Sequence, residues 1–136
     1  MIKEIVKDNF ILSQVCQDAT KEDLYIVDDL LDTIKFHQTH CVGMAANMIG
    51  YLKNIIVVEN QNGYLILINP VIEKETGTYQ CEESCLSHTG TKQTQRYHKI
   101  KVSYLDVQFK KRIKTFERFT AQIIQHEIDH CKGILI

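Results

Sequence analysis

The chain has 136 residues, with 16 basic and 17 acidic side chains and a formal charge of −1. That length predicts one domain over residues 1–136, large enough to bury a core. The content of 44% hydrophobic and 24% charged residues is typical of a globular protein and excludes a disordered chain. The near-neutral balance excludes a strongly basic surface for nucleic acid, and no apolar run approaches the ~18 residues of a membrane span.

The first residues and the cysteines bear on the cellular compartment. Residues 1–10 alternate charged and apolar side chains, unlike a signal peptide. The five cysteines are an odd number without a secretory signal, which favours a reducing environment. We therefore expect a cytoplasmic protein with neither a nucleic-acid nor a membrane partner.

The first strong pattern in the chain is helical. Thr20 is a candidate N-cap, and apolar residues recur at helical spacing from Leu24 to Ile34. This pattern predicts a helix over about 21–39. Residues 1–19 show little periodicity and could form an extended arm or a short helix.

Residues 41–50 are small and apolar with glycines at intervals, which predicts a close-packed loop or turn. The runs 54–59 and 64–69 then flank Asn62-Gly63, a pattern typical of a β-hairpin. Pro70 is expected to end the second strand.

The rest of the chain adds strands and a final helix. Residues 72–79 are a weaker strand candidate, 100–109 alternate like a strand, and 113–119 should pair back across a basic turn at 110–112. Apolar spacing then predicts a helix over 118–131, stopped by a glycine. The order of helix, antiparallel strands and helix predicts the α+β class rather than alternating βαβ units.

The most informative motif lies on the last predicted helix. His126 and His130 are four residues apart, and Glu127 follows the first of them. Residues i and i+4 share a helical face. Two imidazoles there can bind one metal ion while the carboxylate reaches a bound water. Alone, the pattern also fits a solvated helix with two histidines and two acids.

A hydrolytic metal centre needs a third protein ligand and one open position. Downstream, the place where HExxHxxGxxH proteases carry their third histidine is Ile136. Cys131 directly follows His130 and points about 100° away from it. The third ligand is therefore expected upstream.

The upstream segment CEESCLSH offers several candidates: Cys81, Glu82, Glu83, Cys85 and His88. Thiolate is a strong ligand for zinc or ferrous iron, and we favour Cys85. If Cys81 also bound, the result would be a closed structural zinc site with no water and no role for Glu127.

Three motifs, in order, resemble those of the peptide deformylases. The family pattern GxGxAAxQ is similar to residues 41–48, EGCLS to 83–87, and QHExDHxxG to 125–133. The hairpin ending in ILINP before the second motif is also typical of the family. The resemblance covers nearly the whole chain from about residue 24. It implies a single deformylase-like domain, with antiparallel strands around a C-terminal metal-binding helix.

The resemblance implies a metal centre and a reaction. Cys85, His126 and His130 would bind one divalent ion, natively Fe²⁺ and often replaced by Zn²⁺, Ni²⁺ or Co²⁺. The enzyme would remove the formyl group from formyl-methionyl peptides, including nascent chains at the ribosome. Asp129 could orient a ligand, pair with a base or be solvated.

It also implies catalytic and substrate-binding roles. Glu127 would be the general base toward water and would then protonate the leaving amine. The backbone N–H of Leu86 would donate to the developing oxyanion. Val42 and Gly43 would line the substrate cleft, and Ile123 would form either the methionine pocket or ordinary core.

Four residues depart from or bear on the first two family patterns. Met48 replaces a glutamine that donates to the oxyanion, and methionine has no donor. Loss of one such donor typically costs ~10²–10³ in rate. Asn47 carries an amide one residue earlier, an offset that would aim it elsewhere. Cys41 and Ser84 replace glycines and restrict the backbone angles that glycine could reach.

The leading hypothesis is therefore an active peptide deformylase. The alternatives are a low-activity or inactive homologue that binds peptide N termini, and a hydrolase of another amide substrate. Glu127 favours an enzyme, because a binding module needs no general base. Met48 favours the alternatives.

Overall fold

The computed structural model describes residues 1–136. Its elements are, in chain order, α1 (Asn9–Leu12), η1 (Lys21–Asp23), α2 (Tyr25–Phe36), β1 (Gly43–Ala45), η2 (Ala46–Ile49), β2 (Ile55–Asn60), β3 (Gly63–Ser84), β4 (Thr91–Leu105), β5 (Lys111–Glu117) and α3 (Arg118–Cys131). The five strands form one antiparallel sheet in the order β1-β2-β3-β4-β5. The predicted α+β class is confirmed. No helix is both long and apolar enough to cross a membrane.

The two main helices lie where periodicity placed them. α3 coincides with the prediction over 118–131, whereas α2 is shorter than the predicted helix over 21–39. A 3₁₀ turn precedes α2, and the backbone N–H of Thr20 donates to the Asp23 carboxylate over 2.9 Å. Thr20 thus opens the helical segment as expected, but the first turn is tighter than an α-helix.

The predicted hairpin is confirmed, but the proposed strand end at Pro70 is wrong. β2 and β3 pair across the Asn60–Gly63 turn, and β3 then continues through the proline. Asn69 has a φ of 51°, and its amide bonds the backbone N–H and C=O of Ala19 at 2.7 and 3.1 Å. The register with β4 shifts just here. Proline has no N–H to donate to the neighbouring strand, and the bulge here lets β3 pass Pro70 without that hydrogen bond.

The turn between β4 and β5 lies earlier than the predicted basic turn at 110–112. The carboxylate of Asp106 accepts hydrogen bonds from the backbone N–H groups of Gln108 and Lys110 at 2.9 and 3.0 Å. It also accepts one from Arg112 Nε at 2.9 Å. An acidic residue therefore organises the turn, and the basic residues begin β5.

The N-terminal segment, 1–19, contains α1 within an otherwise extended arm. Val6 N–H donates to the Met48 carbonyl over 2.8 Å, and Cys16 N–H donates to the Cys131 carbonyl over 2.9 Å. The arm therefore packs against both η2 and the end of α3. All five cysteines are free.

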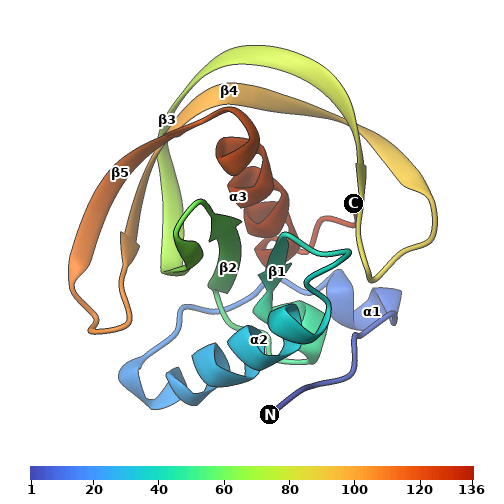
Figure 1. The fold of residues 1–136 in the computed structure, drawn as a ribbon, viewed down its shortest axis with the longest axis vertical. Coiled ribbons are helices and arrows are strands. Elements are labelled where there is room, and N and C mark those ends of the chain that lie inside the picture. The colour runs from blue at the N-terminus through green and yellow to red at the C-terminus, as the bar shows by residue number, and fades with distance from the viewer.

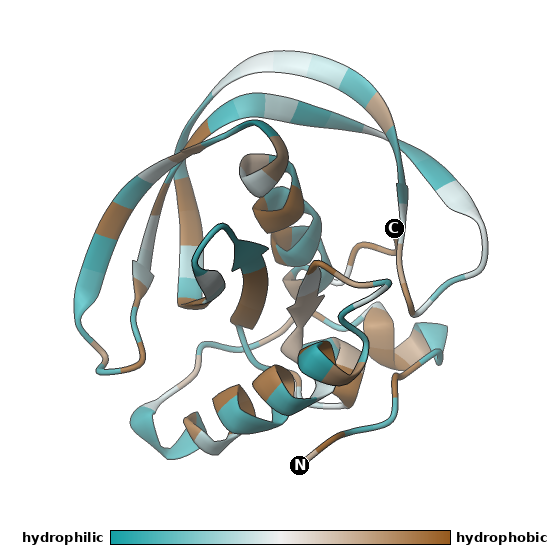
Figure 2. Cartoon of the chain, viewed as in Figure 1, coloured by the Kyte–Doolittle hydropathy of each residue, from teal (hydrophilic) through white to brown (hydrophobic).

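The long ribbon of β3 and β4 arches over α3 (Figure 1). The arch is largely hydrophilic, whereas brown segments concentrate on β1, β2 and α2 (Figure 2). α3 contacts β1, β2, β4 and β5, and residues from both α2 and α3 join the core. Yet α3 also buries four polar side chains: Gln125, His126, Glu127 and His130. Buried polar groups are costly unless they are paired or used, so this face of α3 marks the site.

Candidate metal centre and active site

The three predicted ligands converge on one point. The ligand atoms of Cys85, His126 and His130 all lie within 4.8 Å of one another. Cys85 Sγ is 3.3 Å from His130 Nε2, and the two Nε2 atoms are 3.1 Å apart. Ligands around one tetrahedral zinc-sized ion would be about 3.3 Å apart for two nitrogens and about 3.6 Å for nitrogen and sulfur. The donors therefore fit a single ion, both in spacing and in type.

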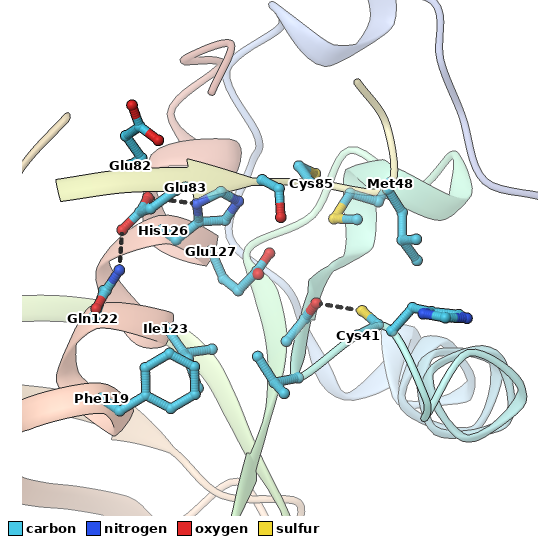
Figure 3. Close-up of a pocket in the computed structure, with 15 residues that line it drawn as sticks. Cys41, Met48, Glu82, Glu83, Cys85, Phe119, Gln122, Ile123, His126 and Glu127 are labelled. Atoms are coloured by element: carbon cyan, nitrogen blue, oxygen red, sulfur yellow. Dashed lines mark hydrogen bonds and ion pairs between the residues drawn. The ribbon is translucent and has the colours of Figure 1, made fainter. Parts of the chain in front are cut away.

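Two elements bring these ligands together. Cys85 follows the last residue of β3, while His126 and His130 lie one turn apart on α3. In Figure 3, the side chains of Cys85 and His126 come from different elements, and Glu127 lies beside them. Cys81 lies outside the cluster, and its thiol instead contacts Glu83 at 3.7 Å. The arrangement does not support the closed four-ligand zinc site.

Glu83 lies behind His126 rather than among the ligands. Its Oε1 is 2.7 Å from His126 Nδ1. Burial alone would raise the pKa of Glu83, but the hydrogen bonds from His126 and Arg96 outweigh it and lower that pKa to about 2. The carboxylate therefore holds a proton on Nδ1, which leaves Nε2 free to face an ion.

Arg96 joins Glu83 to α3. Its Nε and Nη2 donate to the two carboxylate oxygens of Glu83 at 2.9 and 2.7 Å, and its Nη1 donates to Asp129 at 2.6 Å. The role left open for Asp129 is thus a pairing with this buried base. The sequence interpretation missed Arg96. No alternation of apolar residues marks the segment that carries it, because residues 88–98 are polar on both faces of the strand.

The two histidines differ in protonation when no ion is bound. Burial, with a smaller contribution from the charge of neighbouring His126, lowers the pKa of His130 to about 3. Burial also acts to lower the pKa of His126, but Cys85 and Glu83 raise it to about 10. His126 is therefore the protonated member of the pair and His130 the neutral one, and a bound metal ion would displace a proton from His126.

Glu127 is the fourth group of the site. The side chain is buried, and its Oε1 has no hydrogen-bond partner. Burial raises the pKa of Glu127 to about 7; the charge of His126 opposes this shift and that of Glu83 adds to it. A carboxyl group with this pKa can both take up and return a proton near neutral pH.

A cavity of about 310 Å³ opens onto Cys85, His126 and Glu127. The predicted substrate-binding residues Val42 and Gly43 line it, as do Leu86, the predicted oxyanion donor, and Ile123, whose role was left open. Gly43 also has a packing role that the sequence did not suggest. A Cβ at this position would lie 2.5 Å from Ile123 Cγ2 and 2.9 Å from Glu127 Oε2. The glycine therefore lets β1 approach α3 at the Glu127 carboxylate.

The first motif is close-packed as predicted, but it forms β1 and η2 rather than a loop alone. Met48 is buried, and its Sδ accepts from the Ala45 N–H over 3.5 Å. The Asn47 amide donates to the His130 carbonyl over 2.8 Å. Its donor is therefore directed at α3, as the offset suggested, and neither residue supplies an amide to the cavity.

The two residues that replace family glycines fit their positions. Neither Cys41 nor Ser84 has a positive φ, so the backbone there does not require glycine. The Cys41 thiol donates to the Gly43 carbonyl over 3.0 Å (Figure 3). Burial raises the pKa of Cys41 to about 12, which keeps this group a thiol.

Comparison with known proteins agrees with this geometry. The sequence profile described as Polypeptide deformylase matches residues 2–136. A peptide deformylase of Clostridium beijerinckii is 52% identical over 136 residues, 100% of both chains. Peptide deformylase 1 of Clostridium perfringens is 36% identical over 134 residues, covering 94% of this chain and 90% of that one.

Solved structures show the same fold. The Met-Ala-Ser-bound class I type b peptide deformylase of Acinetobacter baumannii superposes with a TM-score of 0.90 at 27% identity, covering 99% of this chain and 97% of that one. The enzyme of Thermotoga maritima gives 0.89 at 28% identity, covering 99% and 95%. By its sequence, its fold and the arrangement of its Cys-His-His cluster, the chain belongs to the peptide deformylase family.

Proposed function

We propose that this cavity removes the N-formyl group from formyl-methionyl peptides by metal-dependent hydrolysis. The observation that carries the proposal is the convergence of one thiol group and two imidazoles at the wall of a cavity, with an unpartnered carboxylate beside them. Deformylation is the reaction of the family to which the chain belongs.

In this proposal, Cys85, His126 and His130 hold one divalent ion and leave one coordination position for water. When bound, the ion acts as a Lewis acid and lowers the pKa of a water in that position toward neutrality. A thiolate with two imidazoles suits Fe²⁺, Zn²⁺, Ni²⁺ and Co²⁺. We propose Fe²⁺ as the native ion and the others as substitutes.

In this proposal, one protein group transfers protons and another stabilises the developing negative charge. Glu127 takes a proton from the attacking water and delivers it to the leaving amine. The backbone N–H of Leu86 donates to the oxyanion that develops on the formyl oxygen. Because the Met48 side chain has no hydrogen-bond donor, the oxyanion would receive its hydrogen bond from the Leu86 N–H. Val42 and Gly43 line the path of the peptide.

A pure binding role is not favoured. A buried carboxylate without a hydrogen-bond partner is costly, and Glu127 gains a purpose only when it exchanges protons with water. Full-length identity of 52% to a peptide deformylase supports the same conclusion. We propose that the substrates are nascent chains emerging from ribosomes in the cytoplasm.

The deciding experiment measures deformylation of formyl-Met-Ala-Ser by protein loaded anaerobically with Fe²⁺. The Glu127→Ala variant, loaded equally, is the control. We expect formate release by the wild type and a loss of several orders of magnitude in the variant. Stoichiometric iron with equal, background rates in both proteins would overturn the proposal.

A further inference from the structure

Gln122 lies on α3 one turn before His126 and forms part of the cavity wall. Its Nε2 donates to Glu83 Oε2 over 3.0 Å and lies 3.6 Å from Cys81 Sγ. Its Oε1 accepts from the Tyr79 hydroxyl over 3.3 Å. Every polar atom of this side chain thus has a partner on β3.

The three partners lie on one face of the strand. Tyr79, Cys81 and Glu83 alternate along β3, so their side chains point to the same side, toward α3. The ring of Tyr79 is held by stacking on His98 of β4, with centroids 4.2 Å apart. One helical side chain therefore joins α3 to β3 immediately before the strand reaches Cys85.

Gln122 also completes the hydrogen bonding of the Glu83 carboxylate. Oε1 accepts from His126 and from Arg96 Nη2, whereas Oε2 accepts from Arg96 Nε and from Gln122. A carboxylate has about four lone-pair sites, and these four donors fill them, with the Cys81 thiol farther away at 3.7 Å from Oε2. Figure 3 shows Glu83 between Gln122 and His126, bonded to both. With its sites filled, the carboxylate has one orientation, and so has the imidazole bonded to it.

We propose that Gln122 is a positioning residue of the metal centre. Its amide fixes Glu83, through which His126 is oriented, and together with Tyr79 it ties the strand leading to Cys85 to the helix that carries both histidines. This inference rests on the proposed ligand set, and it concerns the retention of the ion rather than the reaction. The hydrogen bond from Gln122 to the Glu83 carboxylate is stronger than one between neutral groups, and it accounts for a polar residue at this position in the cavity wall.

The test compares Gln122→Leu with Phe119→Leu in Co²⁺-loaded protein. Both residues line the same cavity from α3, but no hydrogen bond joins Phe119 to Glu83. The rate of Co²⁺ loss to excess chelator is followed by the thiolate-to-Co²⁺ absorption. We expect roughly tenfold faster loss in Gln122→Leu, the lower end of the effect of outer-shell partners on metal affinity. Phe119→Leu should release the ion at the wild-type rate.

A third variant, Tyr79→Phe, removes only the hydroxyl that holds the Gln122 carbonyl and leaves the cavity wall unchanged. It should accelerate Co²⁺ loss by a smaller factor than Gln122→Leu. A residue that merely supported the fold would lower the melting temperature of the metal-free protein and leave Co²⁺ loss unchanged. Wild-type Co²⁺ loss in Gln122→Leu would overturn the inference. If that variant fails to fold, a wild-type rate in Tyr79→Phe would overturn it instead.

These outcomes are separable from those of the proposed function. If wild-type protein showed no thiolate-to-Co²⁺ absorption, the ligand set itself would be wrong. If the wild type showed that absorption and Gln122→Leu released the ion no faster, only the role of Gln122 would be refuted.

Discussion

Adding one methyl group at Gly43 should lower the activity of the enzyme, because the new group would displace buried side chains next to the site. In Gly43→Ala, the new Cβ would lie 2.5 Å from Ile123 Cγ2, 2.9 Å from Glu127 Oε2 and 3.2 Å from Glu127 Cγ. Carbon atoms pack at about 3.5–4.0 Å, so Ile123 and Glu127 must retreat by up to about 1 Å. Gly43 is not in the positive-φ region, so the clash alone is being tested.

The magnitude follows from these distances. Overpacking of this kind costs about 1–3 kcal/mol in the free energy of unfolding. A displacement of about 1 Å at a catalytic group can cost ~10² in rate. We therefore expect kcat/KM on formyl-Met-Ala-Ser to fall about 100-fold, while urea unfolding shows the smaller loss of stability.

Gly63→Ala is the matched control for Gly43→Ala. A Cβ there meets nothing within 4 Å, but its φ of 122° strains any other residue. This control should lose stability and keep its kcat/KM. If Gly43→Ala kept kcat/KM within about twofold of the wild type, the close approach of β1 to the carboxylate would not matter, and the reasoning would be refuted.

Three further predictions concern charge and hydrogen bonding around the metal centre. Met48→Gln should raise kcat about tenfold by adding an oxyanion donor, measured at equal metal content; an unchanged kcat would show that the cavity needs no second donor. Arg96→Met should cost about 3–5 kcal/mol in urea unfolding, because it leaves Glu83 buried without its main partner; a loss below about 1 kcal/mol would contradict this. The lowered pKa of Glu83, about 2 against 4.5 when unfolded, should contribute up to about 3 kcal/mol of stability that is complete above about pH 4.5 and lost as the pH falls toward 2. Unfolding of the metal-free protein across that range should show this loss, and Glu83→Gln should flatten it; parallel curves would exclude it.

Local patterns carried most of the fold. The boundaries of α3 and the hairpin of β2 and β3 followed from side-chain periodicity and turn residues, because both depend on neighbours in sequence. The strand end predicted at Pro70 was wrong because it too relied only on neighbours in sequence. The local rule ends a strand at proline, whereas a tertiary contact between Asn69 and Ala19 builds a bulge there.

The ligands could be proposed from sequence, but their supports could not. His126 and His130 are linked by helical spacing, and Cys85 lies in a motif of its own. Arg96 reaches Glu83 only because β3 and β4 pair in one register, and register is set by contacts far along the chain. Residues 88–98 are polar on both faces, so alternation could not reveal the strand that carries this arginine.

The order of the sheet also determines when the active site can form during synthesis. Every strand pairs with its neighbour in sequence, so pairing can proceed as the chain emerges, with short loops to close. α3 follows all five strands and supplies two of the three proposed ligands. Until this helix docks, the core lacks the side chains that α3 contributes, and the Cys85 side chain has neither of its two proposed histidine co-ligands. Metal uptake should therefore be the last event of folding, and it would report that the whole sheet is in place.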